Sequence, residues 1–174
     1  MRRFLLNILY APWRDKYINR CSEKKSEQHE ACVFCEIWTV QDRDDETYVL
    51  ARYRHVMVVL NTYPYAGGHL LVIPGDHISD LDLCSIEVRS EIIEVISAAS
   101  LILKKILGAQ GVNIGINAGK AAGAGIPDHL HVHLVPRWAG DTNFLPVIGQ
   151  TKQISVDLRR VYDQLKKPFQ EVKI

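Results

Sequence analysis

The stretch DHLHVHLVPRW, from Asp128 to Trp138, places three of the chain's seven histidines at every second position. In a β-strand, side chains at positions i, i+2 and i+4 point to the same face of the sheet. We therefore expect the histidines to line one face, while the aliphatic residues between them enter the hydrophobic core on the other. The histidines are His129, His131 and His133, and the aliphatic residues are Leu130, Val132 and Leu134.

The rest of the chain predicts an α+β domain built on an antiparallel meander sheet. Apolar runs bounded by turn residues predict strands over residues 48–51, 56–60, 69–74 and 112–117. Between the third and fourth of these strands, apolar residues at helical spacing predict one long central helix over residues 85–107, capped by Ser85. A C-terminal helix is expected over residues 154–167, with Thr151 or Ser155 near its start and Pro168 beyond its end. Since no βαβ units recur, we expect the helices on one face of the sheet.

Length and composition are those of an ordinary globular chain with one folded domain. The 174 residues are 47% hydrophobic and 24% charged. The formal net charge of +1 gives no basic surface for nucleic acid, and no segment approaches the ~20 apolar residues of a membrane helix. The apolar run at residues 4–10 is short and lacks a small-residue cleavage site. We therefore expect a cytoplasmic protein with no nucleic-acid or membrane partner.

Three alternating imidazoles admit three interpretations, of which one is a solvated strand face without function. A second is a metal site, but a ligand at i+4 lies about 13 Å from the ligand at i, too far for one ion. The third is a nucleophilic histidine, which attacks phosphorus when an acceptor holds its other ring nitrogen. The loop upstream contains Gly119, Gly123 and Gly125, which let backbone N–H groups approach a phosphate. This loop favours the third interpretation.

The histidine run resembles the His-φ-His-φ-His-φ-φ signature of the histidine triad (HIT) family of nucleotide hydrolases and transferases, where φ is a hydrophobic residue. The resemblance covers residues 32–138, and its flanks resemble the bacterial branch of diadenosine tetraphosphate phosphorylases (ATP adenylyltransferases). It implies a HIT-like catalytic domain over residues 32–174, preceded by an N-terminal arm and polar link over residues 1–31. The further matching positions are Leu60-Asn61, Gly68–Pro74, His77 and Asn117.

The resemblance implies a role for each matching residue. The middle histidine, His131, attacks the α-phosphorus of a nucleotide, and the carbonyl of a neighbouring strand holds its Nδ1 proton. His133 contacts the phosphate or the leaving group. Asn61 binds the ribose hydroxyls, although an asparagine at a strand end is also a common turn former. Asn117 lies beside the phosphate.

One departure from the family pattern lies just before the histidines. Where most members carry a serine or threonine, this chain has Gly125-Ile126-Pro127-Asp128. Because proline has no N–H, we expect the backbone N–H groups of Gly125 and Ile126, or the side chain of Lys120, to bind the phosphate. A hydroxyl that protonates the leaving group is excluded at this point. The resemblance implies that phosphorylase-like members share this substitution, which favours phosphorolysis.

The pair Cys32 and Cys35 forms half of a tetrahedral zinc site. A redox dithiol and two ordinary cysteines are the alternatives, and the remaining metal ligands must be histidines or other cysteines. The resemblance to zinc-bearing HIT proteins implies that His77 and His129 complete the site. With four protein ligands such an ion is structural. His55 and His69 are expected to be structural, and His29 lies in the polar link.

We therefore predict an enzyme, a nucleotide phosphorylase or hydrolase acting on dinucleoside polyphosphates through a covalent nucleotidyl-His131 intermediate. Inorganic phosphate is a possible second substrate, and the resemblance implies a homodimer. One alternative is a hydrolase of adenosine phosphoramidates, which removes AMP from an amine. An alternative from another class is a non-catalytic, zinc-stabilised nucleotide-binding module.

Overall fold

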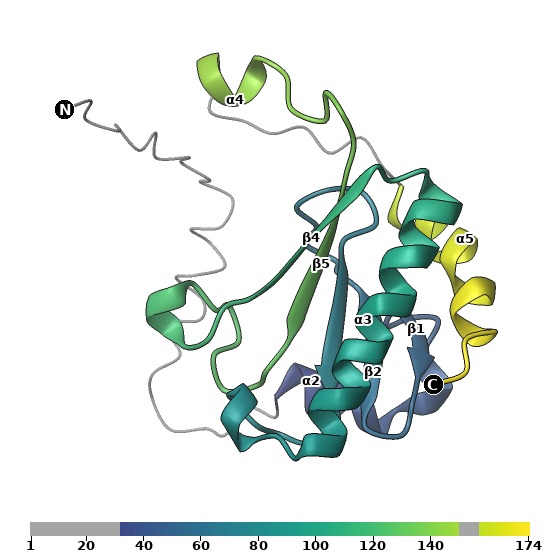
Figure 1. The fold of residues 1–174 in the computed structure, drawn as a ribbon, viewed down its shortest axis with the longest axis vertical. Helices are drawn as coiled ribbons and strands as arrows, with labels where there is room; N and C mark the ends of the chain where they lie inside the picture. Colours follow the sequence, from purple (N-terminus) through teal and green to yellow (C-terminus); the bar gives the residue numbers. More distant parts are fainter. Residues whose placement is uncertain (1–31, 150–156) are drawn as a thin grey trace. The chain divides into compact units, whose positions relative to one another are not determined.

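The computed structural model describes residues 32–149 and 157–174 (Figure 1). The chain divides into two compact units. The described residues of the larger unit are 32–139 and 157–174, and those of the smaller unit are 140–149. The smaller unit contains α4 (Leu145–Ile148). None of the helices in the described ranges has the length and apolarity that crossing a bilayer requires.

The larger unit is built on a five-stranded antiparallel sheet in the order β1-β2-β3-β5-β4. Its strands are β1 (Val49–Arg52), β2 (Val56–Leu60), β3 (Leu70–Pro74), β4 (Gly111–Ile116) and β5 (Val132–Arg137). The α+β prediction is confirmed, and β1 to β3 form a meander. After β3 the chain leaves the sheet through a long helix and returns at the far edge as β4, so β5 fills the place between β3 and β4.

The predicted central helix is confirmed as α3 (Ile86–Leu107). Ser85 caps its first turn, since the hydroxyl of Ser85 accepts a hydrogen bond from the backbone N–H of Val88. Gly108 ends the helix in the left-handed conformation, with φ of 65°.

The C-terminal helix α5 (Leu158–Gln170) runs further than predicted. Its N-cap is Asp157, whose carboxylate accepts from two backbone N–H groups; the caps expected at Thr151 and Ser155 lie outside the described residues. Pro168 does not stop the helix, because Phe169 is buried in the core and the N–H of Glu171 still donates to the carbonyl of Lys167. The prediction that Pro168 lies beyond the helix end is therefore wrong.

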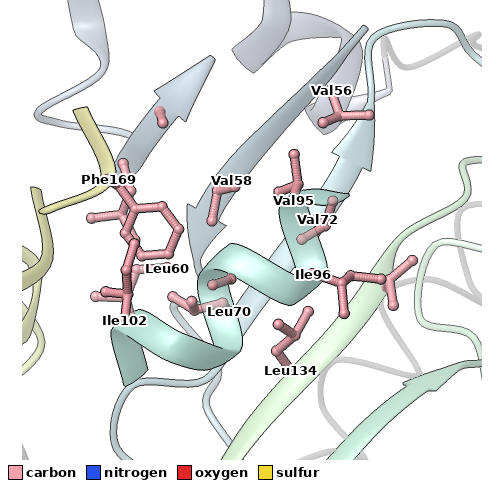
Figure 2. Packing of buried hydrophobic residues seen from close by; sticks show 14 of the residues in the cluster. Val56, Val58, Leu60, Leu70, Val72, Val95, Ile96, Ile102, Leu134 and Phe169 are labelled. Atoms are coloured by element: carbon pink, nitrogen blue, oxygen red, sulfur yellow. The ribbon is translucent and has the colours of Figure 1, made fainter. Parts of the chain in front are cut away.

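The hydrophobic core fills both faces of the sheet, because β2 and β3 are buried on both sides. On one face, α3 and α5 pack against alternate residues of the strands, and Figure 2 shows Val95, Ile96 and Ile102 of α3 in one cluster with the strand residues Val58, Leu70 and Leu134. On the other face, Phe34 packs against Met57, Val59, Leu71 and Ile73. Phe34 belongs to the short helix α2 (Val33–Thr39), which the sequence did not predict. Three 3-10 turns, η1 (Gln41–Arg43), η2 (Leu81–Leu83) and η3 (Lys120–Ala122), complete the unit.

Candidate active site and metal centre

Four predicted metal ligands come together on the sheet face opposite α3. One ligand atom from each of Cys32, Cys35, His77 and His129 lies within 4.8 Å of all the others. The Nδ1 atom of His129 is 3.3 Å from the Sγ of Cys32, and the Nδ1 atom of His77 is 3.2 Å from the Sγ of Cys35. Two thiols and two imidazoles at this spacing are the donor set of a tetrahedral zinc site. The cluster can hold a metal ion.

Three separate segments supply these ligands. Cys32 is the N-cap of α2 and Cys35 lies one turn later, so both thiols project from the start of the helix. His77 follows β3, and His129 precedes β5. The Nε2–H of His129 donates to the carbonyl of Pro74 at 2.9 Å, which leaves Nδ1 of His129 unprotonated and turned toward the thiols. A metal-binding imidazole commonly donates its other N–H in this way.

His131 lies two residues beyond this cluster and is almost fully buried, with 6% of its surface exposed. Its Nδ1–H donates to the carbonyl of His129 at 2.8 Å. The acceptor is therefore in the same segment, and the expectation of a carbonyl from a neighbouring strand is wrong. Burial lowers the pKa of His131, partly offset by this hydrogen bond. The ring is neutral with its lone pair on Nε2, which is the state a nucleophile needs.

The strand that was expected to carry all three histidines begins later than predicted, at Val132. Of the three histidines only His133 is in β5. Pro74, near the end of β3, has no N–H to extend the ladder, and its carbonyl is taken by His129. The predicted division of faces nevertheless holds, since the aliphatic residues between the histidines are buried against α3. These residues are Leu130, Val132 and Leu134.

A second pair of imidazoles adjoins His131. The ring centroids of His131 and His133 are 4.9 Å apart. Nδ1 of His133 also lies within hydrogen-bond distance of Nε2 of His69, at 3.0 Å. His69 is fully buried at the entry to β3, and the ring of Tyr65 contacts both His69 and His133. His69 was expected to be merely structural, and the structure places it against the predicted site.

Asn61 follows β2 and adjoins the same imidazoles. Its Oδ1 accepts from the backbone N–H of Tyr63 at 2.9 Å, which is the turn-forming contact that the sequence allowed. Its Nδ2 donates to Nδ1 of His69 at 3.3 Å. The predicted contact of Asn61 with ribose stays a prediction.

The remaining predicted phosphate ligands lie in and near the glycine-rich loop. Asn117 follows β4, and Lys120 is exposed at the start of η3. Gly119 and Gly123 adopt φ of 77° and 90°, a conformation that other residues rarely adopt. Gly125 is exposed, whereas Ile126 packs against the core cluster around Phe34. The binding of phosphate by Asn117, Lys120, Gly125 and Ile126 remains a prediction.

Two neighbours of the histidines were not singled out from the sequence. The Phe34 ring lies 5.4 Å from that of His129 and 5.3 Å from that of His131, measured between centroids. The Tyr65 ring stacks on that of His133, with centroids 5.7 Å apart. Phe34 lies inside the Cys-x-x-Cys motif and Tyr65 precedes the Gly-His pair, so their positions in the sequence could have marked them as neighbours of the site. Their contacts with the histidines depend on strand register, which the sequence does not give.

Known proteins resemble this chain over most of its length. The HIT domain family model matches residues 43–140. The AP-4-A phosphorylase of Mycobacterium tuberculosis (strain ATCC 25618 / H37Rv) is 40% identical over 162 residues, which are 91% of this chain and 82% of that protein.

Solved structures agree with the sequence comparison. A Zn-bound histidine triad family protein from Mycobacterium smegmatis has a TM-score of 0.66 and 28% identity, over 81% of this chain and 94% of that one. A hypothetical histidine triad nucleotide-binding protein from Sulfolobus tokodaii strain7 has a TM-score of 0.60 and 30% identity, over 80% of this chain and 90% of that one. The chain belongs to the HIT domain family.

Proposed function

We propose that this protein is an enzyme that splits dinucleoside polyphosphates, such as diadenosine tetraphosphate, through a covalent nucleotidyl-His131 intermediate. The observation that carries the proposal is the hydrogen bond from Nδ1–H of His131 to the carbonyl of His129. It fixes the tautomer in which Nε2 holds the lone pair. Similarity to an AP-4-A phosphorylase over most of the chain supports the substrate class.

The reaction then proceeds in two displacements. Nε2 of His131 attacks the α-phosphorus of diadenosine tetraphosphate, the bond from that phosphorus to its bridging oxygen breaks, and ATP leaves with the electron pair. The adenylyl-imidazole carries positive charge, which the carbonyl of His129 stabilises through Nδ1–H. An oxygen of inorganic phosphate then attacks the same phosphorus. The phosphorus–nitrogen bond breaks, its electron pair returns to Nε2, and ADP is released.

We assign the other interactions of this reaction to the residues that the sequence predicts around the phosphate. His133 adjoins the reacting ring and contacts the phosphate. Backbone N–H groups of Gly125 and Ile126, with Lys120 and Asn117, stabilise the negative charge on the non-bridging oxygens. In acyl transfer, one hydrogen-bond donor fixed in advance against a developing oxyanion is worth about 2.7–4 kcal/mol.

Cys32, Cys35, His77 and His129 are proposed to hold a structural zinc ion. When bound, the ion cross-links α2, the segment after β3 and the segment before β5, and it contributes binding energy to folding. Burial raises the pKa of the Cys35 thiol, and the neighbouring Cys32 raises it further; a bound cation favours the thiolates instead. Free thiols in such a centre fit a reducing compartment, for which we propose the cytoplasm.

A homodimer formed through β4 is also part of the proposal. The two edges of the sheet differ: at β1 the carbonyl of Val49 accepts from Tyr162 and Lys166 of α5, whereas β4 is an edge strand with exposed Ile114. Such an edge pairs readily with another strand. Light scattering should give twice the monomer mass, and Ile114→Lys should lower it; a monomeric mass for the unaltered protein contradicts this.

The experiment that tests the activity is incubation with diadenosine tetraphosphate, with and without inorganic phosphate. A phosphorylase yields ADP and ATP only when phosphate is present, and a hydrolase yields AMP and ATP in its absence. If neither pair of products forms, the proposed function is wrong. Release of AMP from an adenosine phosphoramidate in place of these products would favour the phosphoramidate hydrolase.

A further inference from the structure

A chain of hydrogen bonds leads from the backbone of Tyr65 to the ring of His133. The N–H of Tyr65 lies 3.1 Å from Nδ1 of His69, and Nε2 of His69 lies 3.0 Å from Nδ1 of His133. The side-chain amide of Asn61 also lies 3.3 Å from Nδ1 of His69. These contacts determine which ring nitrogens carry protons, because the backbone N–H of Tyr65 can act only as a donor.

The backbone N–H of Tyr65 can only donate, so Nδ1 of His69 must accept. A neutral His69 therefore carries its proton on Nε2, and that proton can only be donated to Nδ1 of His133. Nδ1 of His133 is then an acceptor, so a neutral His133 carries its own proton on Nε2. Protonating Nδ1 of His133 would set two N–H groups against each other over 3.0 Å.

We propose that His69 is a positioning residue that holds His133 neutral with its proton on Nε2, as a hydrogen-bond donor to the phosphate of the nucleotide. This inference rests on the proposed function, and it adds the role and protonation state of a ring that the family resemblance only places near the phosphate. His133 stabilises charge without transferring a proton, because a neutral imidazole gives up its remaining proton only at very high pH.

Burial keeps His69 in the neutral state that this arrangement requires. The side chain has no exposed surface, and burial, with smaller contributions from His133 and His131, lowers the pKa of His69 to about 3. A proton on Nδ1 of His69 would also oppose the N–H groups of Tyr65 and Asn61. The ring is thus an uncharged, fixed donor at neutral pH.

The ring of Tyr65 contacts both His69 and His133. It stacks on His133 with centroids 5.7 Å apart and an interplanar angle of 22°, and it lies 4.6 Å from the centroid of His69. The centroid of the His131 ring lies 4.9 Å from that of His133, with an interplanar angle of 68°. With His133 held by its contacts with Tyr65 and His69, a phosphate bonded to His131 adjoins an imidazole whose orientation and tautomer are already set, which avoids reorganisation during the reaction.

The direct test is a long-range ¹H–¹⁵N spectrum of the full-length protein, purified with its metal and labelled at histidine, near neutral pH. Such spectra separate the two neutral tautomers and the imidazolium of each ring, and a His133→Asn variant assigns the signals of His133. We expect both His69 and His133 as neutral rings protonated at Nε2. A proton on Nδ1 of His133, or an imidazolium there, overturns the inference.

Variants of His69 test the consequence for catalysis. His69→Gln keeps an amide N–H in reach of Nδ1 of His133, whereas His69→Leu removes the donor. We expect kcat to fall about 10- to 100-fold in the leucine variant, with a smaller change in KM and partial rescue in the glutamine variant. His55→Leu, which alters a histidine outside the site, serves as the control with unchanged kcat.

The outcomes separate this inference from the proposed function. Equal kcat in the leucine variant and the unaltered protein overturns the positioning role. If the leucine variant does not fold, the spectrum of the unaltered protein still decides the tautomer. If that protein shows the expected tautomers but cleaves no dinucleoside polyphosphate, the proposed function fails while the assigned protonation state holds.

Discussion

His129 contacts both the metal centre and the candidate nucleophile, His131. Its Nδ1 faces the two thiols, its Nε2–H donates to Pro74, and its carbonyl accepts from His131. Any shift of this backbone moves the acceptor that fixes the tautomer of His131. The metal site and the reacting imidazole are therefore mechanically coupled, although a structural ion takes no part in the reaction.

Replacing the nucleophile should separate chemistry from binding. We expect His131→Ala to abolish turnover of diadenosine tetraphosphate while the Kd for a nucleotide changes by less than about tenfold, because the other phosphate ligands remain. Calorimetric titration with the nucleotide, alongside the turnover assay, checks both halves. Turnover that survives the substitution would show that another group attacks phosphorus.

The buried His69 should make folding stability depend on pH. The unfolded chain binds a proton on this ring below about 6.5, whereas the folded chain does so only below about 3. The contribution of His69 is therefore complete above pH 6.5 and is lost as the pH falls through this interval, by up to about 1.4 kcal/mol per pH unit. Urea unfolding of the wild type and of His69→Gln at several pH values measures this. Identical slopes for the two proteins would contradict the expected shift.

For the candidate site, the sequence predicted which residues take part better than it predicted the contacts between them. The spacing of Cys32 and Cys35 indicated half a metal site, and the alternation of His131 and His133 indicated a shared face. The hydrogen bond from His131 to His129, and that from His69 to His133, depend on side-chain rotamers and on the pairing of β3 with β5. Periodicity carries no information about either.

The order of strands is the feature of the fold that local patterns could not predict. Strand lengths and the long helix follow from apolar spacing, and α3 begins at its predicted cap, Ser85. The insertion of β5 between β3 and β4 is a non-local pairing, in which His133 lies between Leu71 and Gly115. The same pairing brings His69, at the entry to β3, into contact with His133. The end of α5 was misjudged because burial of Phe169 outweighs the cost of Pro168.

The loss of folding stability in three glycine-to-alanine variants should depend on the backbone conformation of each glycine and on the space around it. At Gly68 φ is 83° and an added Cβ would lie 2.4 Å from Cδ1 of Leu107, whereas Gly108 has φ of 65° and open space around it. We expect Gly108→Ala to cost about 1–2 kcal/mol from the left-handed conformation alone, and Gly68→Ala to cost more. Gly115, with an ordinary φ and open space, is the control.

Denaturant unfolding of the three variants measures this ranking. Gly68 immediately precedes His69 in the chain, so we also expect Gly68→Ala to reduce turnover. A Gly68 variant as stable as the Gly108 variant would mean that α3 and this loop do not pack as described.

Across the larger unit, the metal centre ties together segments that are far apart in the chain. Cys32 and His129 are 97 residues apart, yet their ligand atoms lie 3.3 Å from each other. A link of this kind stabilises a fold whose sheet order requires long-range pairing, because the ligands come together only in the folded chain and the free energy of metal binding therefore adds to that of folding.

Metal removal should therefore destabilise the whole unit. A zinc-to-protein ratio near one is expected in purified protein, and a chelator should lower the free energy of unfolding by several kcal/mol. Cys32→Ser should lose the metal and show little further change with chelator. Cys84→Ser, which alters a cysteine outside the cluster, should retain the metal. A zinc ratio near zero in the unaltered protein would exclude the structural zinc ion.

The most direct test of the central claim is to trap the intermediate. The enzyme is mixed with diadenosine tetraphosphate without inorganic phosphate and quenched under alkaline denaturing conditions, because phosphorus–nitrogen bonds to imidazole hydrolyse in acid. Mass spectrometry of the digested protein should then find an adenylyl group on the peptide that contains His131, and it should be absent from His131→Ala. An unmodified His131 in an enzyme that is turning over under these conditions would contradict the mechanism.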